Sequence, residues 1–408
     1  MNYQNTSRDL IKKNKLGDPN TFCILPFTHL STTVYGQIRL CCRSKAISKI
    51  DDESLLDVWN GEKLKKIRND LVNGIRVKEC QNCWKMEDNN IVSLRQSQNI
   101  GKIEKYKNNE DIKILELKLS NLCNLKCRMC SPVASTPWLS EWDDIKQFYN
   151  LQDREWHDNI VKENPTIINK FAKNKKFLKD FEKIKDNITE LEFSGGEPLL
   201  DPLHYQILDS IIDRSKEISL KYSTNLSVLG TSKYDISDYW PKFKDVNLTI
   251  SIDGFPDLHE YIRTGANSNV LKNNINEVRS FTDMKGSTCI SAYNAPFLAE
   301  TAKYICDDLK IRWYTNRLQW PDFLSLSSVP KKYLKQGIDG LDNIHIKSEW
   351  NINHSIQIER QLNDAKKWLQ SKIDLSTIDK FVKYTDILDK NRKTSYWNFV
   401  NKNDYKNY

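Results

Sequence analysis

The sequence predicts an α/β fold in which a parallel sheet of six strands curls toward a barrel. Two observations lead to this prediction. From about residue 110 onward, short apolar segments alternate with longer stretches of helical periodicity, and repeated strand–helix units form parallel sheets with right-handed crossovers. In addition, 408 residues with 39% hydrophobic composition are enough for one large and one small domain.

Six segments have the apolar, β-branched character of strands. They are IKILELKLS (112–120), ITELEFS (188–194), ISLKYST (218–224), VNLTISID (246–253), STCISAY (287–293) and IRWYTNRL (311–318). Helical stretches such as PLHYQILDSIIDRS and SNVLKNNINEVRSFTD separate them. The first crossover, about residues 131–187, is unusually long, and we expect it to carry additional helices.

We expect three domains along the chain. Residues 1–100 hold five of the ten cysteines and form a small Cys-rich domain. Residues 110–330 form the barrel. Residues 331–408, with stretches such as QIERQLNDAKKWLQSK, form a helical C-terminal extension.

Composition and charge argue against several classes of protein. The net charge of +8 is spread along the chain without a dense basic block, so a nucleic-acid partner is not expected. No apolar run approaches the roughly 20 residues of a membrane span, and the polar N-terminus lacks the apolar region of a signal peptide. We therefore expect a cytoplasmic protein with no membrane partner. In that compartment clustered cysteines bind metal rather than form disulfides.

Three cysteines follow the first predicted strand in CNLKCRMC: Cys123, Cys127 and Cys130. Three thiolates on one loop can hold three irons of a [4Fe–4S] cluster, whose usual ligand set is four thiolates. The fourth iron is then open to a small molecule. Taken alone, the same spacing also fits part of a zinc site.

Polar residues and glycines follow the next three strands. Ligands of parallel α/β sheets lie at the carboxyl ends of strands, so these residues are predicted to converge. In SGGEP, the glycines Gly195 and Gly196 let backbone approach a ligand closely, and Glu197 and Pro198 hold the turn. Side chains suited to the hydroxyls of a ribose end the third and fourth strands, at Ser223, Asn225 and Asp253.

In this order, CNLKCRMC, SGGEP, STN and SIDG resemble the radical SAM enzymes over about residues 112–320. The resemblance implies a partial (β/α)6 TIM-like barrel in which Cys123, Cys127 and Cys130 carry the catalytic cluster. It also implies that S-adenosylmethionine (SAM) chelates the open iron. One electron, from a reductant such as flavodoxin or ferredoxin, then cleaves SAM to methionine and a 5′-deoxyadenosyl radical that takes a substrate hydrogen.

The same resemblance assigns roles to residues at the mouth of the barrel. It implies that Gly195, Gly196 and Glu197 meet the methionyl amino group, and that Ser223 and Asn225 lie near the ribose or carboxylate. In HEYIRTG, Arg263 resembles an arginine that pairs with the SAM carboxylate; a surface arginine is the alternative. Met129 departs from the family, which often has an aromatic residue before the third cysteine.

The N-terminal region, with FCILPFTHLSTTVYGQIRLCC and CQNCW, resembles a SPASM or Twitch auxiliary-cluster domain. This module usually follows the barrel and here precedes it. The resemblance implies an auxiliary iron–sulfur cluster on four thiolates: Cys23, Cys41, Cys80 and Cys83. Zinc is the alternative metal. Cys42 is either a spare thiol or the ligand in place of Cys41, and His29 is a further substitute ligand.

Auxiliary-cluster radical SAM enzymes of this type commonly modify peptides or proteins, and this is the substrate class that the resemblance implies. Radical oxidation or modification of a small molecule, sugar or nucleotide is the alternative. A non-catalytic iron–sulfur electron carrier or redox sensor is a third possibility, although a carrier has no need of the GGEP turn.

Overall fold

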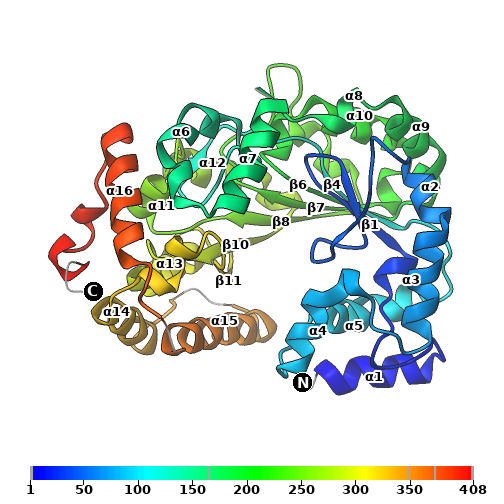
Figure 1. Cartoon of the computed structure of the whole chain (residues 1–408), viewed down its shortest axis with the longest axis horizontal. Coiled ribbons are helices and arrows are strands. Elements are labelled where there is room, and N and C mark those ends of the chain that lie inside the picture. Colours follow the sequence, from blue (N-terminus) through cyan, green and yellow to red (C-terminus); the bar gives the residue numbers. More distant parts are fainter. Residues whose placement is uncertain (1–2, 164–165, 348–349, 372–373, 406–408) are drawn as a thin grey trace. The chain divides into compact units, whose positions relative to one another are not determined.

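The computed structural model describes residues 3–163, 166–347, 350–371 and 374–405. The chain divides into two compact units. The first comprises Met1–Asn121, Ile168–Lys221 and Pro241–Asp245, and the second comprises Leu122–Ile167, Tyr222–Trp240 and Val246–Tyr408. All six predicted strands are present, and within each unit the pairs that they form with one another are parallel, which confirms the predicted α/β class (Figure 1).

Strand β4 (Ile114–Lys118) is central to the first unit. It pairs in parallel with β6 (Glu190–Ser194) on one side and with β1 (His29–Thr32) on the other. Antiparallel strands β2 (Gln37–Arg39) and β3 (Ala46–Lys49) continue from β1. The Cys-rich N-terminal segment therefore extends the sheet in which the predicted barrel begins, a pairing that the sequence did not predict.

Helices of the first unit pack on this sheet through apolar side chains. Ile11 of α1, Ile103 of α5 and Ile114 of β4 belong to one fully buried cluster, which removes apolar surface from water. Helix α10 begins where the Asp201 carboxylate caps the backbone and Pro202 takes the first helical position. The helices are α1 (Tyr3–Lys13), α2 (Leu55–Asn60), α3 (Glu62–Val72), α4 (Gln81–Asp88), α5 (Leu94–Tyr106), α8 (Lys170–Lys173), α9 (Lys175–Ile184) and α10 (Pro202–Ser210).

Strands β8 (Asp245–Ser251), β10 (Asp283–Ile290) and β11 (Arg312–Arg317) form the sheet of the second unit, all parallel. Strand β7 (Ser219–Thr224) is divided between the two units. The range of β10 differs from the predicted 287–293. The segment DMKG looks unlike a strand, yet it pairs with β8 from Asp283 onward, so tertiary pairing overrides its local preference.

The helices predicted for the long crossover and for the C-terminal extension are present. Helices of the second unit are α6 (Trp142–Ile145), α7 (Leu151–Glu163), α11 (Pro256–Ile262), α12 (Ser268–Val278), α13 (Leu298–Lys303), α14 (Lys331–Asp342), α15 (Ile352–Gln370) and α16 (Ile378–Arg392). Among the described residues, no helix is long and apolar enough to cross a membrane. The division into three domains along the sequence stays a prediction.

Candidate active site

A short ladder shapes the loop that carries the three barrel cysteines. Strand β5 (Lys126–Cys127) pairs antiparallel with β9 (Arg263–Thr264), which places Arg263 opposite Cys127. The amide of Cys130 donates to the carbonyl of Cys127 at 2.9 Å and closes the turn. Cys123, Cys127 and Cys130 are partly buried free thiols. The loop therefore presents three sulfur donors from eight consecutive positions.

The charges around these thiols fit a cationic cofactor. Burial raises the pKa of the Cys130 thiol, and the neighbouring Cys127 and Cys123 raise it further. Burial also raises the pKa of Cys127, but the positive charges of Arg263 and Arg392 oppose that rise. Clustered thiolates need cations beside them, and the irons of a cluster are such cations.

Thiols are the donors that both cysteine groups offer. A [4Fe–4S] cluster takes each thiolate on a different iron. The residues of both cysteine groups therefore fit iron–sulfur clusters by the chemistry of their donors.

Arg263 lies below the surface, with 13% of its side chain exposed. Its Nη1 donates to the sulfur of Cys127 at 3.4 Å, and its Nη2 lies 2.8 Å from Oδ2 of Asp253. No described residue accepts a hydrogen bond from its buried Nε. The alternative of a surface arginine is therefore wrong, whereas contact with the SAM carboxylate stays a prediction.

Asp253 lies behind Arg263 rather than at an exposed strand end. It is fully buried, and its Oδ1 accepts from the backbone amide of Cys289 at 2.8 Å. Burial raises the pKa of this carboxyl, whereas the positive charge of Arg263 opposes the rise. Its Oδ2 forms the ion pair with Arg263, so Asp253 is placed to orient Arg263, and its contact with a ribose hydroxyl stays a prediction.

Of the two polar residues predicted after β7, the structure brings one to the cysteine loop. Asn225 Nδ2 lies 3.9 Å from the sulfur of Cys123 and donates to Asn124 Oδ1 at 3.1 Å. Its Oδ1 accepts from the amide of Ser227 at 2.9 Å, which fixes the orientation of the side-chain amide. Ser223 is exposed at the end of β7.

The GGEP turn follows β6 in the first unit and lies against the end of β4. Gly195 has a φ of +127°, and a Cβ there would lie 2.9 Å from the carbonyl oxygen of Ser120, so no other residue fits. The amide of Gly196 donates to that same carbonyl at 3.0 Å. Glu197 is buried, and its Oε1 accepts from the amide of Leu199, which begins the helical turn at Pro198. The glutamate and proline hold this turn as predicted.

The four N-terminal cysteines come from separate segments of the first unit. Burial raises the pKa of Cys23, as do the charges of Cys80 and Cys83. Burial likewise raises the pKa of Cys41, and so does the charge of Cys23. Cys23, Cys41 and Cys83 are buried and Cys80 is partly buried, and their joint binding of one cluster stays a prediction.

Cys42 and His29 have polar or charged neighbours of their own. Partial burial of the Cys42 thiol raises its pKa to about 11, and its charged neighbours are Glu116 and Lys118 of β4. His29 Nδ1 bonds to the carbonyl of Leu40 at 2.8 Å, and its Nε2 lies 3.9 Å from Glu116. Cys41 is buried and Cys42 is exposed, and which of the two is the fourth thiolate stays a prediction.

A buried arginine that the sequence did not single out acts on three of the four N-terminal thiols. Arg95 is 3% exposed, forms an ion pair with Glu87 at 2.6 Å and donates to the carbonyl of Phe22 at 2.8 Å. Its positive charge lowers the pKa of Cys23, Cys80 and Cys83 against the effect of burial. The signal in the sequence was the spacing of eight, two steps of four, that puts Arg95 on the same helical face as Ile103.

A charged face on β4, β6 and β7 was also missed. Glu116 stands opposite Glu192 on the neighbouring strand, and Lys221 lies 2.7 Å from Glu190 and 3.3 Å from Glu192. Although burial opposes the change, Lys102 and Lys221 lower the pKa of Glu190 to about 2. Charged residues at every second position of the predicted strands were the available signal.

Two family models match the chain. The SPASM model, an iron–sulfur cluster-binding domain, matches residues 23–84. The model of the radical SAM superfamily matches residues 117–288. The first range contains the four N-terminal thiols and the second contains the cysteine loop, the GGEP turn and Arg263, in the order that the sequence predicted.

Among curated proteins, the radical SAM cyclopropyl synthase TigE of Paramaledivibacter caminithermalis is 26% identical over 282 residues, which cover 65% of this chain. The chain spans about half, 55%, of the length of that relative. Among solved structures, SuiB of Streptococcus suis bound to S-adenosylmethionine is 13% identical with a TM-score of 0.35, covering 74% of this chain and 63% of SuiB. The structure of anSMEcpe with bound AdoMet and the Cp18Cys peptide is 13% identical with a TM-score of 0.34, and the match covers 57% of this chain and 58% of anSMEcpe. TM-scores this low carry no argument about this chain.

Proposed function

The chain carries a radical SAM domain preceded by a SPASM iron–sulfur domain, and on this premise we propose that it is an enzyme that cleaves SAM reductively and abstracts a hydrogen atom from its substrate. Iron–sulfur clusters and SAM are the cofactors of this pair of domains. The observation that carries the proposal is the loop of three partly buried thiols, with Arg263 bonded to one sulfur and Asn225 beside another.

The residues of the loop have distinct tasks in this proposal. Cys123, Cys127 and Cys130 would hold a [4Fe–4S] cluster, which would pass one electron from a reductant to SAM and so supply the chemistry that splits the sulfonium into methionine and a 5′-deoxyadenosyl radical. Arg263, held by Asp253, orients the SAM carboxylate with a fixed, charge-assisted donor. Asn225 donates toward the thiolate of Cys123, which stabilises its negative charge.

The N-terminal group has a different task. Cys23, Cys41, Cys80 and Cys83 are four thiolates, which leave no iron of an auxiliary cluster open. This site therefore binds no substrate directly and passes electrons to or from the substrate radical. The buried cation of Arg95 favours the reduced form of a cluster held there.

We propose a peptide or protein as the substrate, as the auxiliary-cluster resemblance implies, and a flavodoxin or ferredoxin as the reductant. The charged face of β4, β6 and β7 supports a polar substrate, since Lys221 and Glu192 are about one-third exposed. None of the ten cysteines forms a disulfide, which supports a reducing, cytoplasmic location.

Anaerobic reconstitution tests the proposal. The wild type, loaded with iron and sulfide and reduced with dithionite, should release deoxyadenosine from SAM. A variant with Cys123, Cys127 and Cys130 changed to Ala should hold about half as much iron and release none. If this variant binds no iron while its N-terminal segment stays folded and takes zinc, the auxiliary-cluster assignment is wrong.

A further inference from the structure

Arg392, the last residue of α16, is a buried cation at the base of the cysteine loop. Only 2% of its side chain is exposed. Its Nη1 donates to the carbonyl of Lys126 at 2.9 Å and to the hydroxyl of Thr264 at 3.0 Å. One guanidinium nitrogen thus bonds to both strands of the β5–β9 ladder, which carries Cys127 and Arg263.

The other side of the guanidinium is bound equally firmly. Nε and Nη2 both donate to Oε2 of Glu141, at 3.0 and 2.7 Å. Lys126 also forms an ion pair with Glu141. Two cations therefore share one carboxylate, and of the two only Arg392 is fully withdrawn from solvent, since 26% of the Lys126 side chain is exposed. Removing either partner of the Arg392–Glu141 pair shifts the local charge, in opposite directions.

A tryptophan links Arg392 to the cysteine itself. The guanidinium carbon lies 4.7 Å from the ring centroid of Trp138, which is fully buried. The indole Nε1 of Trp138 donates to the carbonyl of Cys127 at 3.0 Å. The backbone is therefore held at Lys126 by Arg392 and at Cys127 by the ring on which Arg392 lies.

Helix α16 contacts the loop again on the far side of Cys127. The hydroxyl of Tyr384 donates to the carbonyl of Arg128 at 2.8 Å. The side chain of Arg128, fully buried, forms an ion pair with Asp389 at 2.6 Å and lies over the ring of Tyr261, its guanidinium carbon 3.7 Å from the centroid. The C-terminal extension thus fixes the chain immediately before and after Cys127.

We propose that Arg392 is a positioning residue for the cluster at Cys123, Cys127 and Cys130, and that its buried charge favours the reduced state of that cluster. The proposal rests on the proposed function. Partners outside the ligand set orient the ligands and tune the metal, and the reduction potential of an iron–sulfur cluster depends on nearby charge and hydrogen bonds. A buried cation stabilises an electron that is added to the cluster, because the low-dielectric protein interior screens the attraction between the two charges only weakly.

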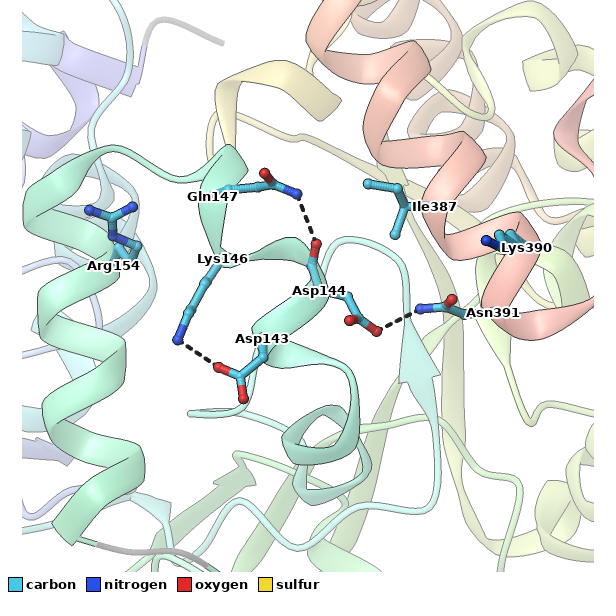
Figure 2. Close-up of a pocket in the computed structure, with 8 residues that line it drawn as sticks. All are labelled: Asp143, Asp144, Lys146, Gln147, Arg154, Ile387, Lys390 and Asn391. Carbon is cyan, nitrogen blue, oxygen red and sulfur yellow. Dashed lines mark hydrogen bonds and ion pairs between the residues drawn. The ribbon is translucent and has the colours of Figure 1, made fainter.

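The same helix offers a matched control. Lys390 is two residues before Arg392 but exposed, and it borders the surface pocket drawn in Figure 2. Next to it, Asn391 donates to Asp144 Oδ2 at 2.8 Å across that pocket (Figure 2). Lys390→Gln removes the same charge as Arg392→Gln from the same helix, with water to screen the change.

The test is a potentiometric titration of the reconstituted protein. The titration is monitored through the spectrum of the reduced cluster, and the cluster of interest is identified because its spectrum changes when SAM is added. Arg392→Gln should shift its midpoint potential to a more negative value, and Glu141→Gln to a more positive one. Lys390→Gln should leave the potential unchanged. Arg392→Lys keeps the positive charge but loses the planar guanidinium that bonds to both strands of the ladder and to Glu141. The potential should therefore stay near that of the wild type, while the apparent affinity for SAM falls about tenfold.

Iron content and the thermal unfolding of the apo-protein, measured on every variant, separate positioning from general destabilisation. If Arg392→Gln does not load iron, the sign of the change in midpoint potential of Glu141→Gln still tests the inference, because only a positive change supports it. Shifts of the same sign in both variants, or no shift in either with full iron content, overturn the inference. A wild type that loads no SAM-responsive cluster overturns the proposed function itself.

Discussion

Arg263 Nη1 lies 3.4 Å from the sulfur of Cys127, directly across the two-residue ladder of β5 and β9. The same guanidinium holds the buried carboxylate of Asp253 at 2.8 Å. The position of the cysteine loop and the direction of this arginine are therefore set together, and a change at either residue moves both.

Arg263→Ala should weaken the binding of SAM and leave both clusters in place. Loss of a charge-assisted hydrogen bond to a carboxylate costs roughly 1.5–3 kcal/mol, or about ten- to a hundredfold in apparent affinity. Titration of SAM into the reduced protein measures the effect. Arg360→Ala, a change at an exposed arginine of α15, is the control and should titrate as the wild type. Equal affinity in both variants would remove Arg263 from the SAM site.

Cys41→Ser and Cys42→Ser should differ in iron content. Cys41 is buried and feels the charge of Cys23, whereas Cys42 is exposed and feels the charge of Glu116. The first variant should lose the iron of the auxiliary cluster, and the second should retain the full complement after anaerobic reconstitution. Iron and sulfide counting decides between them, and the reverse pattern would make Cys42 the ligand.

Cys80→Ala should still release deoxyadenosine from SAM under dithionite, because the cluster loop of the barrel is untouched. It should not complete turnover of the substrate, since the auxiliary site no longer accepts or donates an electron. The triple change of Cys123, Cys127 and Cys130 to Ala is the control and should release no deoxyadenosine. Loss of release in Cys80→Ala, with the barrel cluster intact by spectroscopy, would place the N-terminal site in the primary chemistry.

Glu190 should make the stability of the protein depend on acid pH. Lys102 and Lys221 lower its pKa from 4.5 in the unfolded chain to about 2. A carboxyl with a depressed pKa in the folded state stabilises that state above about pH 4.5, and the contribution is lost as the pH falls from 4.5 toward 2. The difference in unfolding free energy between the wild type and Glu190→Gln should therefore be largest near pH 6 and shrink below pH 4.5.

Glu192→Gln is the matched control for that measurement, because burial raises the pKa of Glu192 instead. A raised carboxyl pKa disfavours the folded state as the pH rises. Denaturant unfolding between pH 3 and 6.5 should show Glu190→Gln losing stability near neutral pH and Glu192→Gln losing less or gaining. Equal losses in the two variants would contradict the assignment.

The strands of the barrel and the residues after them were predictable because strand periodicity and turn chemistry are local. Gly195 needs a positive φ that glycine adopts freely, so the GGEP turn follows from its sequence. The pairing of β1 with β4 was not predictable, since the N-terminal segment has the cysteine pattern of a separate module. The start of β10 was not predictable either, because pairing with β8 overrides the low strand preference of Asp, Lys and Gly in this segment.

The residues missed at the site share one property: their partners lie far away in the sequence. Arg392 was one basic residue among many in a polar helix, and nothing near it indicates a contact with Lys126. Asp253 was predicted from its place at a strand end, but its direction depends on Arg263 and on the amide of Cys289. Sequence patterns predicted where polar groups gather and could not predict which of them pair.

The contacts between α16 and the cysteine loop also determine when that loop can reach its final structure during protein synthesis. Arg128 and Asp389 are 261 positions apart. A ribosome adds roughly 5 to 20 residues per second, so Asp389 is made roughly 13 to 50 seconds after Arg128. Throughout that interval the three thiols stand on a loop without its backing helix, exposed to oxygen and to stray metal ions. Iron delivered to the growing chain would meet an unfinished site, so cluster insertion is best timed after residue 392 has left the ribosome.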